Sequence, residues 1–144
     1  MQVVERAAAT IVGIEVVAPF AELAVVVPQA WARVFARHRD LLSGPDDVFV
    51  EFSTDLGDGD YREVLGVVVD SLPASLPEGW SIAKAPGGRY LHHRHLGDES
   101  TIADTFGAMH RWVEVNGLRA GVHKLDVGYR PGGVAAHDLY LDLG

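Results

Sequence analysis

The sequence of 144 residues predicts an α+β fold, in which mostly antiparallel sheets carry their helices on one face around a central pocket. Segments with strand-like composition outnumber the helical ones, and short turn-rich links between them favour hairpins. The order strand, helix, strand, strand also occurs twice along the chain. We therefore predict a single domain built from two pseudo-repeats, at about 1–72 and 73–144.

The first module contains one predicted helix among strands that are rich in β-branched residues. The strands cover residues 3–5, 10–17, 48–53 and 61–69. A helix is predicted over 28–42, because Pro28 suits the first turn of a helix. Trp31, Val34 and Phe35 then follow at helical spacing, and the Ser43-Gly44-Pro45 stretch would end the helix.

The second module repeats this order. Its predicted strands cover residues 80–85, 89–96, 123–130 and 138–143, with turns at 86–88 and 131–133. A helix is predicted to begin after Gly97, with Asp98 or Ser100 as its N-cap, and to end at Asn116-Gly117. Its apolar face has the spacing i, i+4, i+7 and i+11 and consists of Ile102, Phe106, Met109 and Val113.

Composition excludes several classes of function. The formal charge is −8, from 12 basic and 20 acidic residues, and no basic stripe indicates a nucleic-acid partner. The chain has no cysteine, so disulfides and thiolate chemistry are excluded. The apolar stretch 14–27 contains two glutamates and a proline and cannot span a bilayer. With no signal peptide in evidence, we expect a cytoplasmic protein that needs no cofactor and has no membrane contact.

Several short stretches occur in a characteristic order. They are TIVGI at 10–14, VPQAW at 27–31, DGDY at 58–61, LGVVV at 65–69, APGGRY at 85–90, HKLD at 123–126 and LYLDL at 139–143. This ordered set resembles the GyrI-like small-molecule-binding family, which includes effector-binding domains of AraC-type and MerR-type multidrug regulators and stand-alone integron-cassette proteins. The resemblance implies a pocket between two pseudo-symmetric modules, and bulky cationic, aromatic ligands. With no helix-turn-helix ahead of the first strand, the chain resembles the effector-binding module alone.

Asp126 is the most informative residue of the predicted strand at 123–130. The resemblance implies a carboxylate here that faces the pocket, where the family commonly has glutamate followed two residues later by tyrosine. In this chain Gly128 takes the tyrosine position, and Tyr129 comes one residue late. Plain alternation would place Asp126 and Tyr129 on opposite faces, with Asp126 in solvent. A β-bulge at Gly128 would instead place both side chains on one face.

Aromatic side chains would complete a site for an apolar cation through cation–π attraction. Tyr90 and His92 share a strand face, and the resemblance implies that this strand lines the pocket. For Trp31 and Trp112, on the two helices, a core position is the alternative. Glu51 is a candidate second acid, with a surface position as the alternative. The predicted ligand-binding residues are Asp126, Tyr129, Tyr90, Trp112, Tyr61, Trp31, Glu51 and His92.

Other sites have weaker support in the sequence. The histidines at 92, 93 and 95 lack a third metal ligand fixed by spacing, and those at 110, 123 and 137 are scattered. The acidic segment 55–60 fits a hairpin turn better than a calcium loop.

Two alternatives to ligand binding remain. One is hydrolysis of a reactive small molecule, with Asp126 and either Tyr129 or Tyr90 directing water. The other is a protein-interaction role of the gyrase-inhibitor type. Binding is favoured over catalysis because common catalytic motifs are absent.

Overall fold

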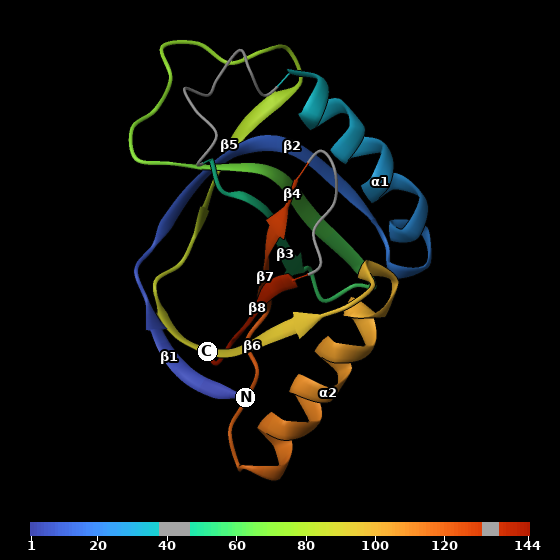
Figure 1. Ribbon diagram of the computed structural model, residues 1–144, viewed down its shortest axis with the longest axis vertical. Coiled ribbons are helices and arrows are strands. Elements are labelled where there is room, and N and C mark those ends of the chain that lie inside the picture. The colour runs from blue at the N-terminus through green and yellow to red at the C-terminus, as the bar shows by residue number, and fades with distance from the viewer. Residues whose placement is uncertain (38–46, 131–135) are drawn as a thin grey trace.

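The computed structural model describes residues 1–37, 47–130 and 136–144. Within these ranges the strands form one eight-stranded antiparallel sheet in the order β1-β6-β8-β7-β3-β4-β2-β5, and two helices lie on one of its faces (Figure 1). The α+β class is therefore confirmed, with one sheet rather than several. The strands are β1 Gln2–Arg6, β2 Ala9–Pro19, β3 Phe49–Asp55, β4 Asp60–Val69, β5 Trp80–Ala85, β6 Gly88–Leu96, β7 His123–Tyr129 and β8 Ala136–Asp142. The helices are α1 Phe20–Arg37 and α2 Ile102–Val115, the latter preceded by the 3₁₀ turn Glu99–Thr101.

The sheet has an internal two-fold symmetry. If β1, β2, β3 and β4 are exchanged with β5, β6, β7 and β8, the strand order is the same when it is read from the opposite edge of the sheet. The symmetry axis passes between β3 and β7, where Glu51 lies opposite Asp126 and Ser53 lies opposite Lys124. Each half also lends its first strand to the other, because β1 pairs with β6 and β5 pairs with β2.

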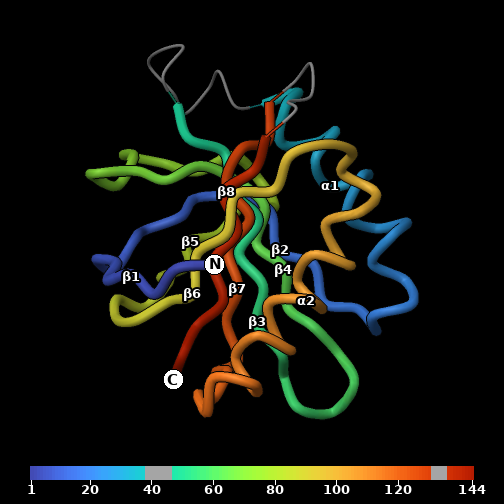
Figure 2. The backbone as a smooth tube through the Cα atoms, turned by 60° about the horizontal axis from the view of Figure 1, so that its bottom comes forward, coloured from blue at the N-terminus to red at the C-terminus, as the bar shows by residue number. Residues whose placement is uncertain are grey.

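The two helices cover the flanks of the same sheet face. Helix α1 packs over β2 and β4, and α2 packs over β6 and β8, and both helices lie on the same side of the strands (Figure 2). The central strands β3 and β7 lie between these two strand pairs in the order of the sheet. Each helix buries an apolar stripe, and a fully buried large apolar side chain contributes roughly 1.5–3 kcal/mol. The buried helix residues are Ala30, Trp31 and Val34 on α1 and Ile102, Met109 and Val113 on α2.

Helix α1 begins at Phe20, so the prediction that it starts at Pro28 is wrong. Pro28 lies in the helix interior, where it cannot donate a hydrogen bond to the carbonyl of Ala24. The ring is exposed, on the side of the helix where water can solvate the freed carbonyl. Burial of the opposite face outweighs the local preference of proline. The predicted helix end at 38–42, the stretch 43–45 and the turn 131–133 lie outside the described residues.

Of the two alternatives for the strand that contains Asp126, the structure shows the bulge at Gly128. Phe49 pairs with Tyr129 whereas Val50 pairs with Val127, which leaves Gly128 as the extra residue of β7. Its φ of +143° is a conformation that side-chain-bearing residues rarely adopt. The extra residue reverses the side-chain alternation, so that Tyr129 joins Asp126 on the helix-covered face.

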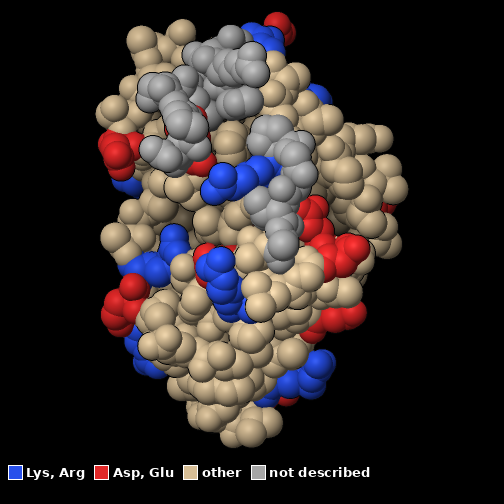
Figure 3. Space-filling model, viewed as in Figure 1, with Lys and Arg blue, Asp and Glu red and all other residues tan. Residues whose placement is uncertain are grey.

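Local turn and cap predictions are also confirmed. In the acidic segment, the side chain of Asp55 accepts a hydrogen bond from the Gly57 amide at 2.9 Å, and β3 and β4 are joined as a hairpin. Asp98 caps the turn before α2, because its carboxylate accepts a hydrogen bond from the Ser100 amide at 2.8 Å. On the face shown in Figure 3, basic and acidic side chains of the described residues are interspersed.

Substituting Gly128 with alanine should destabilise the fold by about 1–3 kcal/mol, because the backbone is strained for any other residue. A Cβ there would also lie 2.8 Å from the Ala136 carbonyl oxygen. Urea unfolding measures the change. The matched control is Gly107→Ala in α2, where the new Cβ would lie 3.5 Å from a flexible Arg111 nitrogen. That control should gain up to about 1 kcal/mol. Equal stability of Gly128→Ala and wild type would contradict the bulge.

Candidate functional site

Two carboxylates face each other at the symmetry axis of the sheet. Glu51 on β3 and Asp126 on β7 are direct cross-strand partners. Both belong to the helix-covered face, since the Tyr129 hydroxyl donates to Glu51 Oε2 at 3.4 Å and the Tyr129 ring stacks on Trp31 of α1. Asp126 is only 2% exposed. Like charges directly opposite each other on a sheet are destabilising, so this pair needs a compensating positive charge.

His137 on β8 supplies part of that compensation. Its ring is fully buried, with Nδ1 2.6 Å from Asp126 Oδ1 and Nε2 3.2 Å from Glu99 Oε1. An imidazole between two carboxylates is suited to donate from both nitrogens, as only the protonated ring can. Burial by itself lowers the pKa of His137, but the hydrogen bond and charge of Asp126, together with Glu99, raise it above its usual value.

Glu51 has no such partner. Its side chain keeps some solvent exposure, yet desolvation by the surrounding protein raises its pKa well above the usual value, and the charges of Glu63 and Asp126 raise it further. Glu63 on β4 is 3% exposed and accepts a hydrogen bond from Ser53. Desolvation raises the pKa of Glu63 to about 7. Among the described residues, neither glutamate forms a close ion pair with a basic side chain.

Aromatic rings border the carboxylates on the α1 side. Trp31 stacks on Tyr129 with ring centroids 4.4 Å apart, and on Phe35 at 5.1 Å. Two buried polar atoms here, Trp31 Nε1 and Asp126 Oδ2, have no hydrogen-bond partner within the described chain. Buried polar atoms of native proteins are usually satisfied, so these two unpartnered atoms are exceptions that lie within the candidate site.

A second group of rings surrounds Lys124, which shares a face of β7 with Asp126. The Lys124 Nζ lies 5.3 Å from the ring centroid of Phe106 on α2 and 5.7 Å from that of Tyr61 on β4. Phe20, at the start of α1, contacts Tyr61 edge-on at 6.0 Å. The acids are therefore flanked by aromatic side chains in both directions along the central strands.

The structure brings some of the predicted ligand-binding residues together and separates others. Asp126, Glu51, Tyr129 and Trp31 converge at the symmetry axis, and Tyr61 lies on the same face beside Lys124. Trp112 is partly buried on α2 and packs into the apolar cluster beneath that helix. Trp112 therefore takes the alternative position in the core of the second half.

Tyr90 and His92 point to the other face of the sheet. The Tyr90 hydroxyl donates to the Pro86 carbonyl at 2.6 Å, and its ring belongs to the apolar cluster on that face. His92 lies 2.9 Å from Asp138 and stacks on Tyr140. The reason is alternation: Leu91 occupies the side of β6 that packs under α2, so its neighbours face away.

Four charged residues of the site have no signal in the sequence that marks them. They are Glu63, Glu99, Lys124 and His137, and each reaches the carboxylate pair from a different element. His137 lies 11 residues from its partner Asp126, and their contact depends on the β7–β8 pairing. Only the strand registers could have identified this residue.

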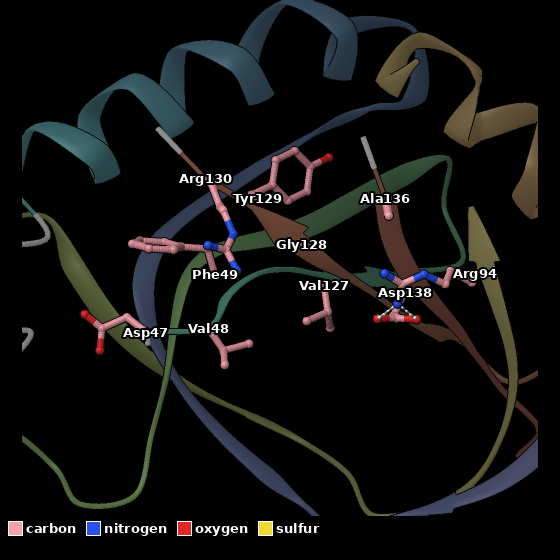
Figure 4. Close-up of a pocket in the computed structure, with 10 residues that line it drawn as sticks. All are labelled: Asp47, Val48, Phe49, Arg94, Val127, Gly128, Tyr129, Arg130, Ala136 and Asp138. Atoms are coloured by element: carbon pink, nitrogen blue, oxygen red, sulfur yellow. Dashed lines mark hydrogen bonds and ion pairs between the residues drawn. The ribbon is translucent and has the colours of Figure 1, made fainter. Parts of the chain in front are cut away.

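A cavity of about 510 Å³ lies where β3 begins and β7 ends, and its lining includes Phe49 and Tyr129 (Figure 4). Its lining includes Val48, Val127 and the ion pair of Arg94 with Asp138, in which the closest nitrogen and oxygen are 3.2 Å apart. The carboxylates at the symmetry axis are not part of its wall. No cluster of three or more His, Cys, Asp or Glu side chains within the described ranges is arranged to hold a metal ion.

Known proteins resemble the chain in sequence family and in fold. A family model described as "Cass2: Integron-associated effector binding protein" matches residues 2–130. A search of curated proteins finds no match. The described part of the chain contains no helix that is long and apolar enough to cross a membrane.

Three solved structures align with 99% of this chain at low sequence identity. SAV2435 bound to tetraphenylphosphonium has a TM-score of 0.77 and 12% identity, over 93% of its own length. The integron cassette protein VCH_CASS2 of Vibrio cholerae has a TM-score of 0.71 and 13% identity, over 95% of its length. The EcmrR C-terminal domain has a TM-score of 0.68 and 10% identity, over 96% of its length. At these identities the likeness shows a common fold.

Replacing Glu63 with glutamine should change how stability depends on pH. The folded chain holds a proton on Glu63 up to about pH 7, whereas an unfolded glutamate loses it near pH 4.5. Wild-type stability therefore falls as pH rises through this window, and glutamine removes that loss. Between pH 4.5 and 8 the difference in unfolding free energy should move in favour of the variant by up to about 3 kcal/mol.

Urea unfolding at several pH values measures this difference. Glu78→Gln, at an exposed glutamate of the loop before β5, is the control and should run parallel to wild type. A constant offset between Glu63→Gln and wild type across the window would show that Glu63 is ionised as it is in the unfolded chain.

Proposed function

The chain belongs to the family of integron-associated effector-binding proteins, and we propose that it binds a hydrophobic organic cation on the helix-covered face of its sheet. Membership in this family makes the chain a small-molecule-binding protein. The chemistry of the carboxylate pair supports the narrower proposal about the ligand. The structural neighbour that is bound to tetraphenylphosphonium shares the fold of this chain, which adds support from outside the molecule.

The observation that carries the proposal is the uncompensated charge of Glu51. Asp126 is paired with His137, whereas among the described residues the side chain of Glu51 has the Tyr129 hydroxyl as its one hydrogen-bond partner. A desolvated carboxylate beside a second carboxylate gains most from a cation. Because Glu51 keeps some exposure while Asp126 is buried, Glu51 would contact the ligand directly. Asp126 would attract the cation through its charge without contacting it.

The surroundings favour a large cation with a weak hydration shell. A small inorganic ion must lose its hydration to reach a desolvated carboxylate, at a cost that few protein groups here repay. An organic cation with aromatic or alkyl substituents loses little hydration. It would gain contact with the stacked rings of Trp31 and Tyr129, and cation–π attraction contributes roughly 0.5–2 kcal/mol at each ring. Localisation in the cytoplasm, where a permeant cation would accumulate, is part of this proposal.

The geometry supports binding better than hydrolysis. The alternative reaction needs a carboxylate and tyrosine that are free to orient water. Asp126 is instead held by His137, and both nitrogens of His137 are engaged by carboxylates. Turnover of a reactive ester that is lost in Asp126→Asn would favour the hydrolase.

Tetraphenylphosphonium should raise the melting temperature of the wild-type protein by several degrees, because a ligand that binds only the folded state stabilises it. Tetraphenylborate, which has a similar shape and a negative charge, should not. Glu51→Gln should weaken cation binding about tenfold or more, equivalent to about 1.4 kcal/mol, and Asp126→Asn should weaken it less. Isothermal titration measures both affinities.

Glu78→Gln is the control for the loss of one acidic residue far from the carboxylate pair, and it should bind as wild type does. If both tetraphenyl ions raised the melting temperature equally, recognition would depend on the shape of the ligand and not on its charge, which would contradict the proposal. Unchanged affinity in Glu51→Gln would remove that residue from the site.

A further inference from the structure

We propose that Lys124 is a built-in cation that fills one end of this site and restricts it to ligands with a single positive charge. The inference rests on the proposed function, and it names the residue that would determine specificity. It predicts an aromatic and acidic subsite that exists in the fold but is occupied by the chain's own ammonium group.

The first support is the position of the ammonium group between two rings. Lys124 Nζ lies 5.3 Å from the centroid of Phe106 and 5.7 Å from the centroid of Tyr61. The two rings come from different halves of the chain, one from α2 and one from β4. A cation between aromatic faces is the arrangement by which proteins recognise organic ammonium ligands. Here the cation is covalently attached to the site.

The second support is electrostatic. Burial lowers the pKa of Lys124, while the charges of Glu63, Asp55 and Glu51 act in the opposite direction and favour the charged amine. The same ammonium lowers the pKa of Glu51 and Glu63. No described carboxylate forms an ion pair with Lys124 within 4.0 Å. The ammonium is therefore held by the field of several acids rather than fixed to one of them.

The third support is the pairing of Lys124 across the central strands. Its cross-strand partner is Ser53, next to the Glu51–Asp126 pair. Ser53 is neutral and donates a hydrogen bond to Glu63, whereas Lys124 brings a charge. The positive charge therefore enters this end of the site from β7 alone. Lys124 occupies the end of the site between Tyr61 and Phe106. The end that contains the stacked rings of Trp31 and Tyr129 has no lysine among the described residues.

The contacts leave one carboxylate without a close cation. His137 lies between Asp126 and Glu99, while Glu51 has no ion pair with a described basic side chain. A ligand with one positive charge would compensate the charge of Glu51. A second charge on the same ligand would meet the ammonium of Lys124 as a like charge.

Lys124→Met tests this inference, because methionine keeps an unbranched, flexible side chain and removes the charge. The probes are decyltrimethylammonium and decamethonium, which share an alkyl chain and differ in having one or two quaternary ammonium groups. We expect the affinity for the dication, relative to the monocation, to rise at least tenfold at pH 8. Isothermal titration of both probes provides this ratio.

The other lysine of the chain provides the matched control. Lys84 is exposed on the edge strand β5, and Lys84→Met should leave the ratio at its wild-type value. Lys124→Arg should keep the preference for the monocation because it retains the charge. Lys124→Gln is a second neutral variant, which should raise the ratio as Lys124→Met does and serves if the methionine variant is unstable.

The outcomes separate the two proposals. If wild type binds the monocation and the ratio is the same in Lys124→Met, Lys124→Gln and wild type, Lys124 does not restrict the site and the inference fails alone. If neither wild type nor any variant binds either cation or tetraphenylphosphonium, the proposed function fails and the inference fails with it.

Discussion

The structure depends on one constraint, which is that two carboxylates meet at the centre of its sheet. Glu51 and Asp126 are opposite each other on β3 and β7, the central one of the three strand pairs that join the two halves of the fold. A pair of like charges at such a position weakens the sheet unless a positive charge comes close. The neighbouring features of the fold bring positive charge or hydrogen-bond donors to these two side chains.

The two halves of the fold differ in how the carboxylate of each is compensated. In the second half, the bulge at Gly128 turns Tyr129 toward Glu51, and β8 places His137 against Asp126. In the first half, no described residue provides a close cation for Glu51, and the lysine that approaches comes from the strand of the other half. A stable fold thus retains an unpaired acid between its helices. Such acids are typical of sites that select a charged ligand, because the ligand completes the charge balance.

Local patterns in the sequence predict the order of elements, because apolar periodicity and turn residues mark each strand and helix. They also indicate a bulge, because a glycine within an alternating strand often marks one, but plain alternation remained the alternative. They were insufficient for the face of β6, since both faces of this sheet are apolar and alternation alone does not say which meets a helix. The family resemblance implies a pocket-lining position for Tyr90, but its ring belongs to the apolar cluster on the other face of the sheet. Pro28 misplaced the start of α1, because burial of the helix outweighs the preference of one exposed residue. His137 reaches Asp126 only through strand pairing, which the sequence does not specify.

The most direct test of this account is the number of protons exchanged when tetraphenylphosphonium binds. It is obtained at pH 7 by isothermal titration in two buffers with different ionisation enthalpies. A cation placed beside Glu51 would lower a pKa that desolvation and neighbouring acids have raised, so binding should release a measurable fraction of a proton. Binding without proton release, or with proton uptake, would show that the cation does not complete the charge of the carboxylate pair.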